Sequence, residues 1–380
     1  MNIIASRATQ LWTLIAEELD IAPSLYEKAS ARHVSVGEWL CRPSSPLAVL
    51  EPRVHSQGSF RYGTVIKPLV ADATYDLDNV VVFTAMQVTT MSQEQLKRRF
   101  GDEIAAYARA HQMQEPIEKG RCWRLPYRDE VSFHLDALPS VPAARATQLA
   151  LRDAGVEDDW ARRAVAITDL THADYRVLST NWLTSNPRGF ARWFESRAAL
   201  GRSQPSGVRA GVVEDVPPYQ WKTPLQRAIQ IFKRHRDVMF ARQPELAPIS
   251  MIITNLAAHA YDGERDLGEA LRGIVSRMGR FVRPVPPRVP NPTHPREDYA
   301  DKWRRDSRLS MNFDGWLSQL RADVMCWDDP FVPFDPALVS QRFAVQLSSE
   351  QQQRLAPSAP LIMVAAATPR VQDAPRPWGR

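Results

Sequence analysis

Two stretches in the first 140 residues alternate between apolar and polar side chains, as strands do. Residues 75–83 begin Tyr-Asp-Leu-Asp-Asn and then become almost wholly apolar, and residues 131–138 carry Val, Phe, Leu and Ala at every second position. Neighbouring side chains on a strand point to opposite faces, so residues two apart share a face. The pattern therefore predicts two strands, each with one buried face.

Apolar residues at spacings of three and four predict helices around these strands. Ser92 with Gln95 has the form of a capping box, and Thr223-Pro224 opens another helix because proline is tolerated in a first turn. The helices that we expect cover residues 6–19, 24–40, 91–112, 223–240, 250–261, 298–303 and 312–323.

Two side-chain groups in the second half of the chain have a simple structural interpretation. Phe190, Trp193 and Phe194 fall at helical spacing after a turn, and core packing between two lobes explains them better than a shelf for stacking bases. The helix 223–240 is rich in charge, and we interpret most of that charge as a solvated face. Much of this charge comes from Lys222, just before the helix, and from Arg227, Lys233, Arg234, His235 and Arg236.

Three segments have the composition of loops. Residues 284–295 contain six prolines, which exclude a helix or a central strand and predict an extended loop. Residues 202–211 are rich in glycine, serine and arginine, which is typical of a loop. Glutamines, prolines and alanines beyond residue 350 predict a loosely held tail.

Length and charge limit the class of protein. A chain of 380 residues exceeds the usual size of one core, so two domains are expected. The net charge of +5 is a mild excess that suits polyphosphate ligands and does not by itself require a nucleic-acid partner or activator.

Cysteine usage and hydropathy predict a cytoplasmic protein. Cys41, Cys122 and Cys326 are widely spaced, form no metal-ligand pattern and are typical of a reducing compartment. The N-terminus lacks the pattern of a signal peptide, and no apolar run reaches the ~20 residues that span a bilayer.

The chemistry predicted for the chain rests on carboxylates. Asp76 and Asp78 share one face of the first strand, and two adjacent like charges repel unless a cation neutralises them. A pair of divalent metal ions bridging nucleotide phosphates would do so, as phosphoryl transfer requires. Asp136 lies on the polar face of the second strand and would join them if the two strands are neighbours.

A short motif upstream strengthens this interpretation. Gln57-Gly58-Ser59 predicts a tight loop in which glycine lets the backbone approach a phosphate, while the N–H and hydroxyl of Ser59 bind it. Each part alone is weak, since a Gly-Ser pair is often only a turn and Asp-x-Asp often only a solvated face. Their combination with Asp136 favours a catalytic site.

In these motifs the chain resembles the bacterial cGAS/DncV-like nucleotidyltransferases, the oligonucleotide cyclases of anti-phage CBASS systems. They belong to the superfamily with a polymerase-β-like palm. The resemblance spans about residues 5–330. Besides the residues above, it rests on the segments 133–139, 184–194, 222–237, 248–254, 291–292 and 299–303.

The resemblance implies an α/β (α+β) fold with two lobes. A palm, which is a mixed sheet flanked by helices, would occupy residues 1–150 and include an N-terminal bracing helix. A helical C-terminal domain would occupy residues 151–350, with a soft boundary over 150–215, and residues 351–380 would form the tail. The active site would lie in the cleft between the lobes.

The resemblance also implies the remaining site residues and ligands. Lys233 and Ser250 match family residues near the nucleotide triphosphate, which makes Lys233 the exception on its charged helix face. Asp76, Asp78 and Asp136 would hold two Mg²⁺ ions, for which Mn²⁺ can substitute. The substrates would be NTPs, ATP and/or GTP, and the product a cyclic di- or trinucleotide second messenger. A monomer is expected, with the tail as a possible handle for accessory CBASS proteins.

Three other functions remain open from the sequence. A linear oligonucleotide synthase or RNA-tailing enzyme would use the same carboxylates, and so would a toxin-type enzyme that labels a protein or a tRNA. A non-catalytic nucleotide-binding regulator is the third. The presence of all three carboxylates argues against the regulator.

Overall fold

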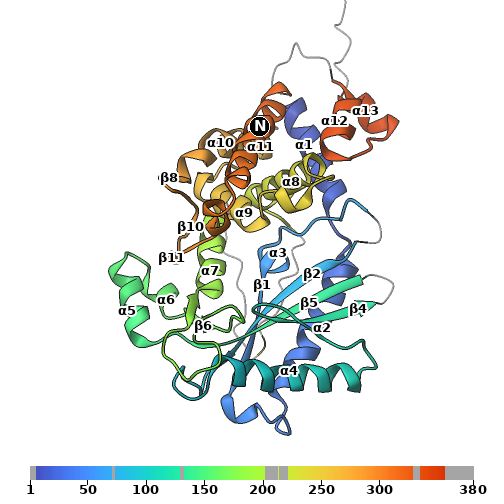
Figure 1. The fold of residues 1–380 in the computed structure, drawn as a ribbon. Coiled ribbons are helices and arrows are strands. Elements are labelled where there is room, and N and C mark those ends of the chain that lie inside the picture. The colour runs from blue at the N-terminus through green and yellow to red at the C-terminus, as the bar shows by residue number, and fades with distance from the viewer. Residues whose placement is uncertain are drawn as a thin grey trace, which may run out of the picture.

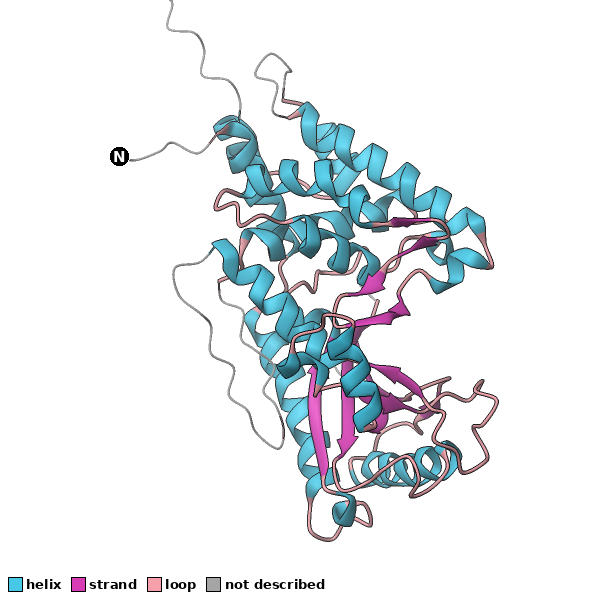
Figure 2. Ribbon diagram, turned by 90° about the vertical axis from the view of Figure 1, so that its left-hand side faces the viewer, coloured by secondary structure: helices cyan, strands magenta, loops and turns pink. Residues whose placement is uncertain are grey.

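The computed structural model describes residues 6–70, 73–128, 132–201, 213, 221–327 and 334–355. A lower lobe contains the main sheet, and an upper lobe consists mostly of helices (Figures 1 and 2). This arrangement confirms the predicted fold class. Among the described residues, no helix combines the length and the apolar character needed to cross a membrane. The three cysteines are free thiols.

The lower lobe is built on a seven-stranded mixed sheet in the order β1-β2-β5-β4-β3, with β6 and β7 continuing from β5. The β2 and β5 strands are parallel, whereas the other pairs are antiparallel. The strands are β1 (Pro52–Gln57), β2 (Tyr75–Phe83), β3 (Ile117–Glu118), β4 (Trp123–Arg128), β5 (Ser132–Pro142), β6 (Val165–Ile167) and β7 (Leu183–Ser185).

Two helices cover one face of this sheet. The predicted helices 24–40 and 91–112 are α2 (Pro23–Cys41) and α4 (Gln93–Ala110), and both pack into one apolar cluster with alternate residues of β2 and β5. Leu77 and Leu135 belong to that cluster, so Asp76, Asp78 and Asp136 occupy the opposite face. The alternation in the sequence therefore predicted correctly which residues each strand buries.

The remaining elements of the lower lobe continue into residues 150–215, the range that was predicted as a soft boundary. The sheet continues to residue 185 through β6 and β7, and two short helices connect β5 to β6. A small satellite cluster lies under these helices. They are α5 (Arg145–Asp153) and α6 (Asp158–Ala161).

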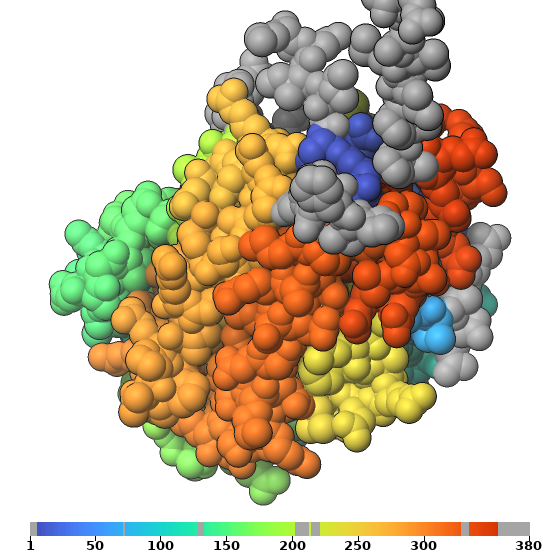
Figure 3. Space-filling model, turned by 90° about the horizontal axis from the view of Figure 1, so that it is seen from above, coloured from blue at the N-terminus to red at the C-terminus, as the bar shows by residue number. Residues whose placement is uncertain are grey.

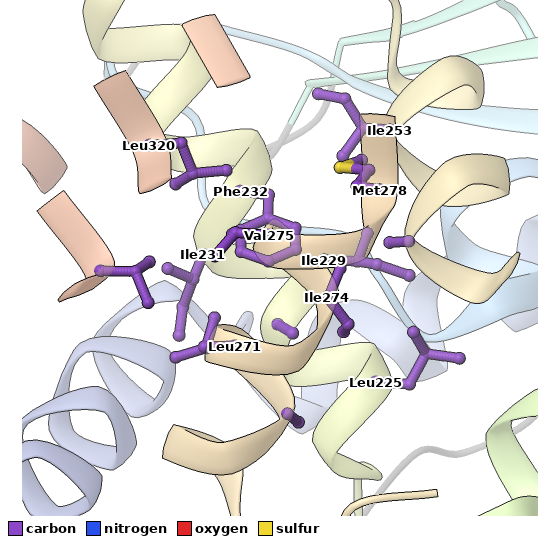
Figure 4. Packing of buried hydrophobic residues seen from close by; sticks show 14 of the residues in the cluster. Leu225, Ile229, Ile231, Phe232, Ile253, Leu271, Ile274, Val275, Met278 and Leu320 are labelled. Carbon is purple, nitrogen blue, oxygen red and sulfur yellow. The ribbon is translucent and has the colours of Figure 1, made fainter. Parts of the chain in front are cut away.

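The upper lobe has its own apolar core, formed where α8 packs against its neighbouring helices (Figure 4). Ile229 and Phe232 of α8 lie beside Ile274 and Val275 of α10 there. Seen from above, α10 and α11 lie side by side on the outer surface (Figure 3). The helices of this lobe are α7 (Pro187–Ala198), α8 (Pro224–Met239), α9 (Ser250–Ala260), α10 (Leu267–Arg277), α11 (Ser307–Cys326), α12 (Pro336–Phe343) and α13 (Ser349–Leu355).

The N-terminal helix departs from the predicted division into domains. Although α1 (Arg7–Leu19) begins the chain, its apolar residues belong to the core of the upper lobe, where it packs against α8 and α10. Trp12 is fully buried there and meets Phe343 edge to face, with ring centroids 5.5 Å apart. Its amphipathic pattern predicted a buried face but not the lobe that buries it.

Three predicted segments also differ in detail. Residues 351–355 are not tail but the end of α13, with Leu355 fully buried; residues 356–380 and 202–211 lie outside the described part. The proline-rich stretch is extended, as predicted, but forms short paired strands, and the expected helix 298–303 is only a 3-10 turn, Asp301–Arg304. Those strands are β8 (Arg283–Pro284), β9 (Pro287–Arg288), β10 (Pro290–Asn291) and β11 (His294–Asp298).

The aromatic residues of α7 join the two lobes, and the turn predicted at 186–189 is the N-cap and first turn of this helix. Phe190 and Phe194 of α7 are buried and contact Tyr62, with ring centroids 5.4 and 5.3 Å apart. Tyr62 ends α3 (Gly58–Tyr62), a short helix that follows β1. The interpretation as core packing between lobes is therefore confirmed.

The charged face of α8 is not solvated, contrary to the prediction. Four of its polar side chains donate hydrogen bonds to the chain that follows α3: Gln226 to the carbonyl of Tyr62, Gln230 to Val65, Lys233 to Thr64 and Arg234 to Lys67. These positions share one helix face, and the donors satisfy carbonyls that no strand pairs. The charge on α8 thus fixes the segment 62–67 between the lobes.

Candidate active site

The three predicted carboxylates meet at one place on the sheet. In the parallel pairing of β2 with β5, Asp78 lies opposite Asp136 and Asp76 lies opposite His134. All three aspartates line one cavity of about 450 Å³, a size in the range of small-molecule sites. Residues 60 positions apart therefore converge only because these two strands are neighbours.

Gly58 fits this site for two steric reasons. Its φ of +71° is a conformation that favours glycine, and a Cβ built on it would lie 2.1 Å from Oδ2 of Asp78. Any side chain at this position would therefore displace the Asp78 carboxylate. Here the structure corrects the predicted loop, because Gly58 and Ser59 form the first turn of α3.

The predicted phosphate-binding residues lie on several elements. Ser59 from α3, Lys233 from α8 and Ser250 from the first turn of α9 line the same cavity as the carboxylates. Gln57 ends β1 opposite Asp78 in the strand register, but it does not line the cavity. The structure thus brings together seven of the eight predicted residues.

Hydrogen bonds hold Lys233 and Ser250 in place. Lys233 is 4% exposed, and its Nζ donates to the carbonyl oxygen and to Oγ1 of Thr64, at 3.0 Å each. Arg236, one turn further along α8, donates to Oγ of Ser250 at 3.2 Å and to the carbonyl of Pro248 at 2.7 Å. Ile249 rather than Ser250 occupies the N-cap of α9, so the Ser250 hydroxyl has no capping role.

Burial and like charge govern the electrostatics of this cavity. Burial, together with the neighbouring carboxylates of Asp76 and Asp136, raises the pKa of Asp78 to about 7. Burial also raises the pKa of Asp76. Burial, with Arg236 acting in the same direction, lowers the pKa of Lys233 to about 7. The site holds more negative charge than its own cations neutralise, which suits an incoming cation.

Sequence reasoning did not single out Arg124, which lies among the carboxylates. It is on β4, opposite Asp136 in the antiparallel register, and it lines the same cavity. The pairing of β4 with β5 brings it there. Arg236 was set aside as solvated, although its position three residues after Lys233 places it near the same helix face.

The donor set fits hard divalent cations. Three carboxylates around one cavity supply the oxygen ligands that Mg²⁺ and Mn²⁺ prefer, and the buried charge of Asp78 favours a cation beside it. Within the described residues, no three His, Cys, Asp or Glu side chains are already arranged around a common metal position. Metal binding would therefore require some movement of these side chains.

Comparison with known proteins identifies the domain that carries the carboxylates. Residues 52–139, which carry the three aspartates, Arg124 and the Gly58-Ser59 pair, match the model of the DncV-like cyclic GMP-AMP synthase nucleotidyltransferase domain. Residues 52–139 form a DncV-like nucleotidyltransferase domain. Enzymes of this family generally use divalent metal ions.

Similar proteins extend the likeness over most of the chain. A c-di-GMP synthase from Roseivirga ehrenbergii is 26% identical over 341 residues, covering 87% of this chain and 82% of that protein. The cyclic dinucleotide synthase CdnG from Bradyrhizobium diazoefficiens is 26% identical over 315 residues, covering 76% and 68%.

A solved structure shares the fold of this chain. The structure of the CdnG enzyme from B. diazoefficiens in complex with GTP superimposes with a TM-score of 0.65 and 21% identity. The superposition covers 92% of this chain and 98% of that one. The shared fold therefore includes both lobes and not the nucleotidyltransferase domain alone.

Proposed function

We propose that this nucleotidyltransferase joins NTPs into a cyclic di- or trinucleotide, with GTP as the first substrate to test and ATP as the second. The observation that carries the proposal is the convergence of Asp76, Asp78 and Asp136 with Ser59 and Lys233 around one cavity. The relatives named for c-di-GMP and cyclic dinucleotide synthesis support both the reaction class and the choice of GTP.

In this proposal the chain's own residues bind and orient the triphosphate. Ser59, Lys233 and Ser250 contact the β- and γ-phosphates, and Lys233 exchanges its bond to Thr64 for a phosphate oxygen. The positive charge of bound Lys233 is favoured by that phosphate, which opposes the effect of burial on its pKa. The α-phosphate then faces the carboxylates, in line with a ribose hydroxyl of a second nucleotide.

Asp76, Asp78 and Asp136 would hold the metal ions, two Mg²⁺ or Mn²⁺. Bound there, the ions would neutralise the phosphate oxygens and lower the pKa of the attacking hydroxyl. Asp136 helps to remove the hydroxyl proton, and pyrophosphate leaves. A second attack of the same kind, after the linear intermediate turns in the pocket, closes the ring.

The proposal extends to anti-phage (CBASS) signalling in the cytoplasm, in which the cyclic product would activate an effector. It also retains a monomeric enzyme and accessory proteins that bind residues beyond 355. The genes adjacent to the one that encodes this chain test the signalling role, because an effector gene is expected there.

The test of the reaction is incubation with all four NTPs and Mg²⁺ or Mn²⁺, followed by phosphatase and mass spectrometry. We expect a phosphatase-resistant cyclic product from the wild-type chain. Asp76→Ala/Asp78→Ala should lower product formation by at least about a thousandfold, since these side chains would bear on the transition state directly. Asp158→Ala/Asp159→Ala, a pair of surface carboxylates on α6, is the matched control and should leave synthesis unchanged.

Other outcomes separate the alternatives. A product that phosphatase degrades completely would identify a linear oligonucleotide synthase. Labelling of an added protein or tRNA, with little product from NTPs alone, would identify a toxin-type enzyme. Synthesis that persists in the Asp76→Ala/Asp78→Ala variant would contradict the assignment of the carboxylates.

A further inference from the structure

Arg124 makes ionic contacts with two of the three site carboxylates. Its Nε donates to Oδ1 of Asp136 at 2.7 Å and its Nη2 donates to Oδ2 of Asp136, also at 2.7 Å. The same Nη2 lies 3.5 Å from Oδ1 of Asp76. Its Nη1 lies 3.3 Å from Nδ1 of His134, which also contacts the Thr74 hydroxyl. Arg124 therefore bridges β2, β4 and β5.

The contact with Asp136 is of the strong, bidentate kind. Two parallel N–H···O bonds between a guanidinium and a carboxylate fix both partners in one plane. Because Arg124 and Asp136 face each other in the strand register, the backbone itself holds them together. Each oxygen of Asp136 thus already accepts a charged hydrogen bond, and a metal ion would have to share or displace it.

The other cations of the cavity are engaged elsewhere. Lys233 donates to Thr64, and the guanidinium of Arg236 binds Asp237 at 2.6 Å, besides Ser250 and Pro248. Of the described residues that line the cavity, Arg124 is the cation that contacts Asp76 and Asp136 directly. It supplies one positive charge to a cluster of three carboxylates.

We propose that Arg124 is the resident counter-ion of the site and competes with divalent metal for Asp136 and Asp76. The inference rests on the proposed function, because it concerns the same metal-binding carboxylates. Two divalent ions beside an arginine that is always charged repel it, and the negative triphosphate offsets that repulsion. Metal ions therefore bind weakly to the free enzyme and tightly together with the NTP. Arg124 is a positioning residue that links the two binding events.

Direct measurement of Mn²⁺ binding tests this competition. The full-length chain is titrated with Mn²⁺, with free Mn²⁺ read from its EPR signal, in the absence and presence of a nonhydrolysable GTP analogue. Without the analogue, Arg124→Gln should bind Mn²⁺ at least about tenfold more tightly than the wild type, because one competing charge is gone. The analogue should tighten Mn²⁺ binding strongly in the wild type and less in Arg124→Gln.

Two further variants separate competition from a structural role. Arg121→Gln removes an exposed arginine paired with Asp169 outside the cavity, and its Mn²⁺ affinity should equal that of the wild type. Arg124→Lys keeps the charge but loses the planar fork, so its Mn²⁺ affinity should lie between those of the wild type and Arg124→Gln. This variant also carries the test if Arg124→Gln does not fold.

The outcomes distinguish this inference from the proposed function. The competition is refuted if the wild type binds Mn²⁺ with the analogue but, without it, neither Arg124→Gln nor Arg124→Lys binds Mn²⁺ more tightly than the wild type does. The metal site stands in that case. If the wild type binds no Mn²⁺ even with the analogue, the metal assignment itself is refuted. If Arg121→Gln increases the Mn²⁺ affinity as much as Arg124→Gln does, the effect is a general one of net charge, and the role of Arg124 is refuted.

Discussion

Asp78 is subject to both steric and electrostatic constraints in the site. Its carboxylate is packed against Gly58, where no side chain fits. Asp78 lies opposite Asp136 of β5 and two residues after Asp76 on β2. Burial and these two neighbours raise its pKa to about 7. A protein that places an acid in such surroundings loses stability unless a cation compensates for the charge.

This residue predicts a specific pH dependence of stability without metal. The folded-state pKa lies above the value of 3.8 for an ordinary aspartate, so the native state holds the Asp78 proton more tightly than the unfolded state. The contribution of Asp78 to stability is therefore greatest below pH 4 and falls as pH rises toward 7. Asp78→Asn removes this loss, because the amide stays neutral.

Urea unfolding in EDTA between pH 4 and pH 8 measures the effect. The free energy of unfolding of Asp78→Asn should rise relative to the wild type across this range and level off above pH 7. We expect a final difference of at least about 1 kcal/mol, since one pKa unit corresponds to about 1.4 kcal/mol. A difference that does not change with pH would contradict the assigned environment of Asp78.

At the scale of elements, α8 connects the chemistry with the fold. Its start at Thr223-Pro224 was predicted. The structure adds a capping box, in which Gln226 N–H donates to Oγ1 of Thr223 and Thr223 N–H donates to Oε1 of Gln226. The same helix carries Lys233 and Arg236 into the cavity. Loss of order in the first turn of α8 should therefore lower the free energy of unfolding and weaken NTP binding at the proposed phosphate site.

Replacement of this cap should have two separable effects. Thr223→Ala should cost about 1 kcal/mol of unfolding free energy, the usual loss for an N-cap. It should also raise the KM for the NTP, because Gln226 no longer holds the Tyr62 carbonyl in place. Ser92→Ala removes the equivalent box from α4, which does not contribute to the cavity, and should show the same loss of stability with an unchanged KM. An equal rise of KM in both variants would contradict the proposed link.

At the scale of the whole molecule, the N-terminal helix α1 packs against helices from the second half of the chain. This first helix belongs to the upper lobe, whereas residues 23–185 build the sheet and its neighbouring elements. Lys222 and Gln230 both bind Asp20, just after α1, at 2.6 and 2.8 Å. The N-terminus therefore supports the helix that carries Lys233.

Truncation of the central side chain of α1 should show this dependence. Trp12→Ala should lower the unfolding free energy by about 3–5 kcal/mol, as expected for a large buried aromatic residue. Trp221→Ala, at a site that is 82% exposed, should change it far less. Thermal and urea unfolding measure both, and comparable losses in the two variants would refute the assignment of α1 to the core of the upper lobe.

The sequence by itself determined what depends on local geometry. The period of two along residues 75–83 and 131–138 fixed which faces carry the aspartates, and the caps at Ser92 and Thr223 fixed where two helices begin. These features depend on residues within a few positions of each other, and the structure agrees with them.

Only the tertiary structure decided what depends on residues far apart in the chain. The pairing of β2 with β5 placed Asp78 opposite Asp136, the pairing of β4 with β5 placed Arg124 on Asp136, and packing put α1 in the upper lobe. The polar face of α8 was predicted to be solvated because the backbone carbonyls that it binds lie some 165 positions earlier in the chain. Hydrophobic periodicity predicts whether a face is apolar or polar, but which element packs against that face depends on the tertiary fold.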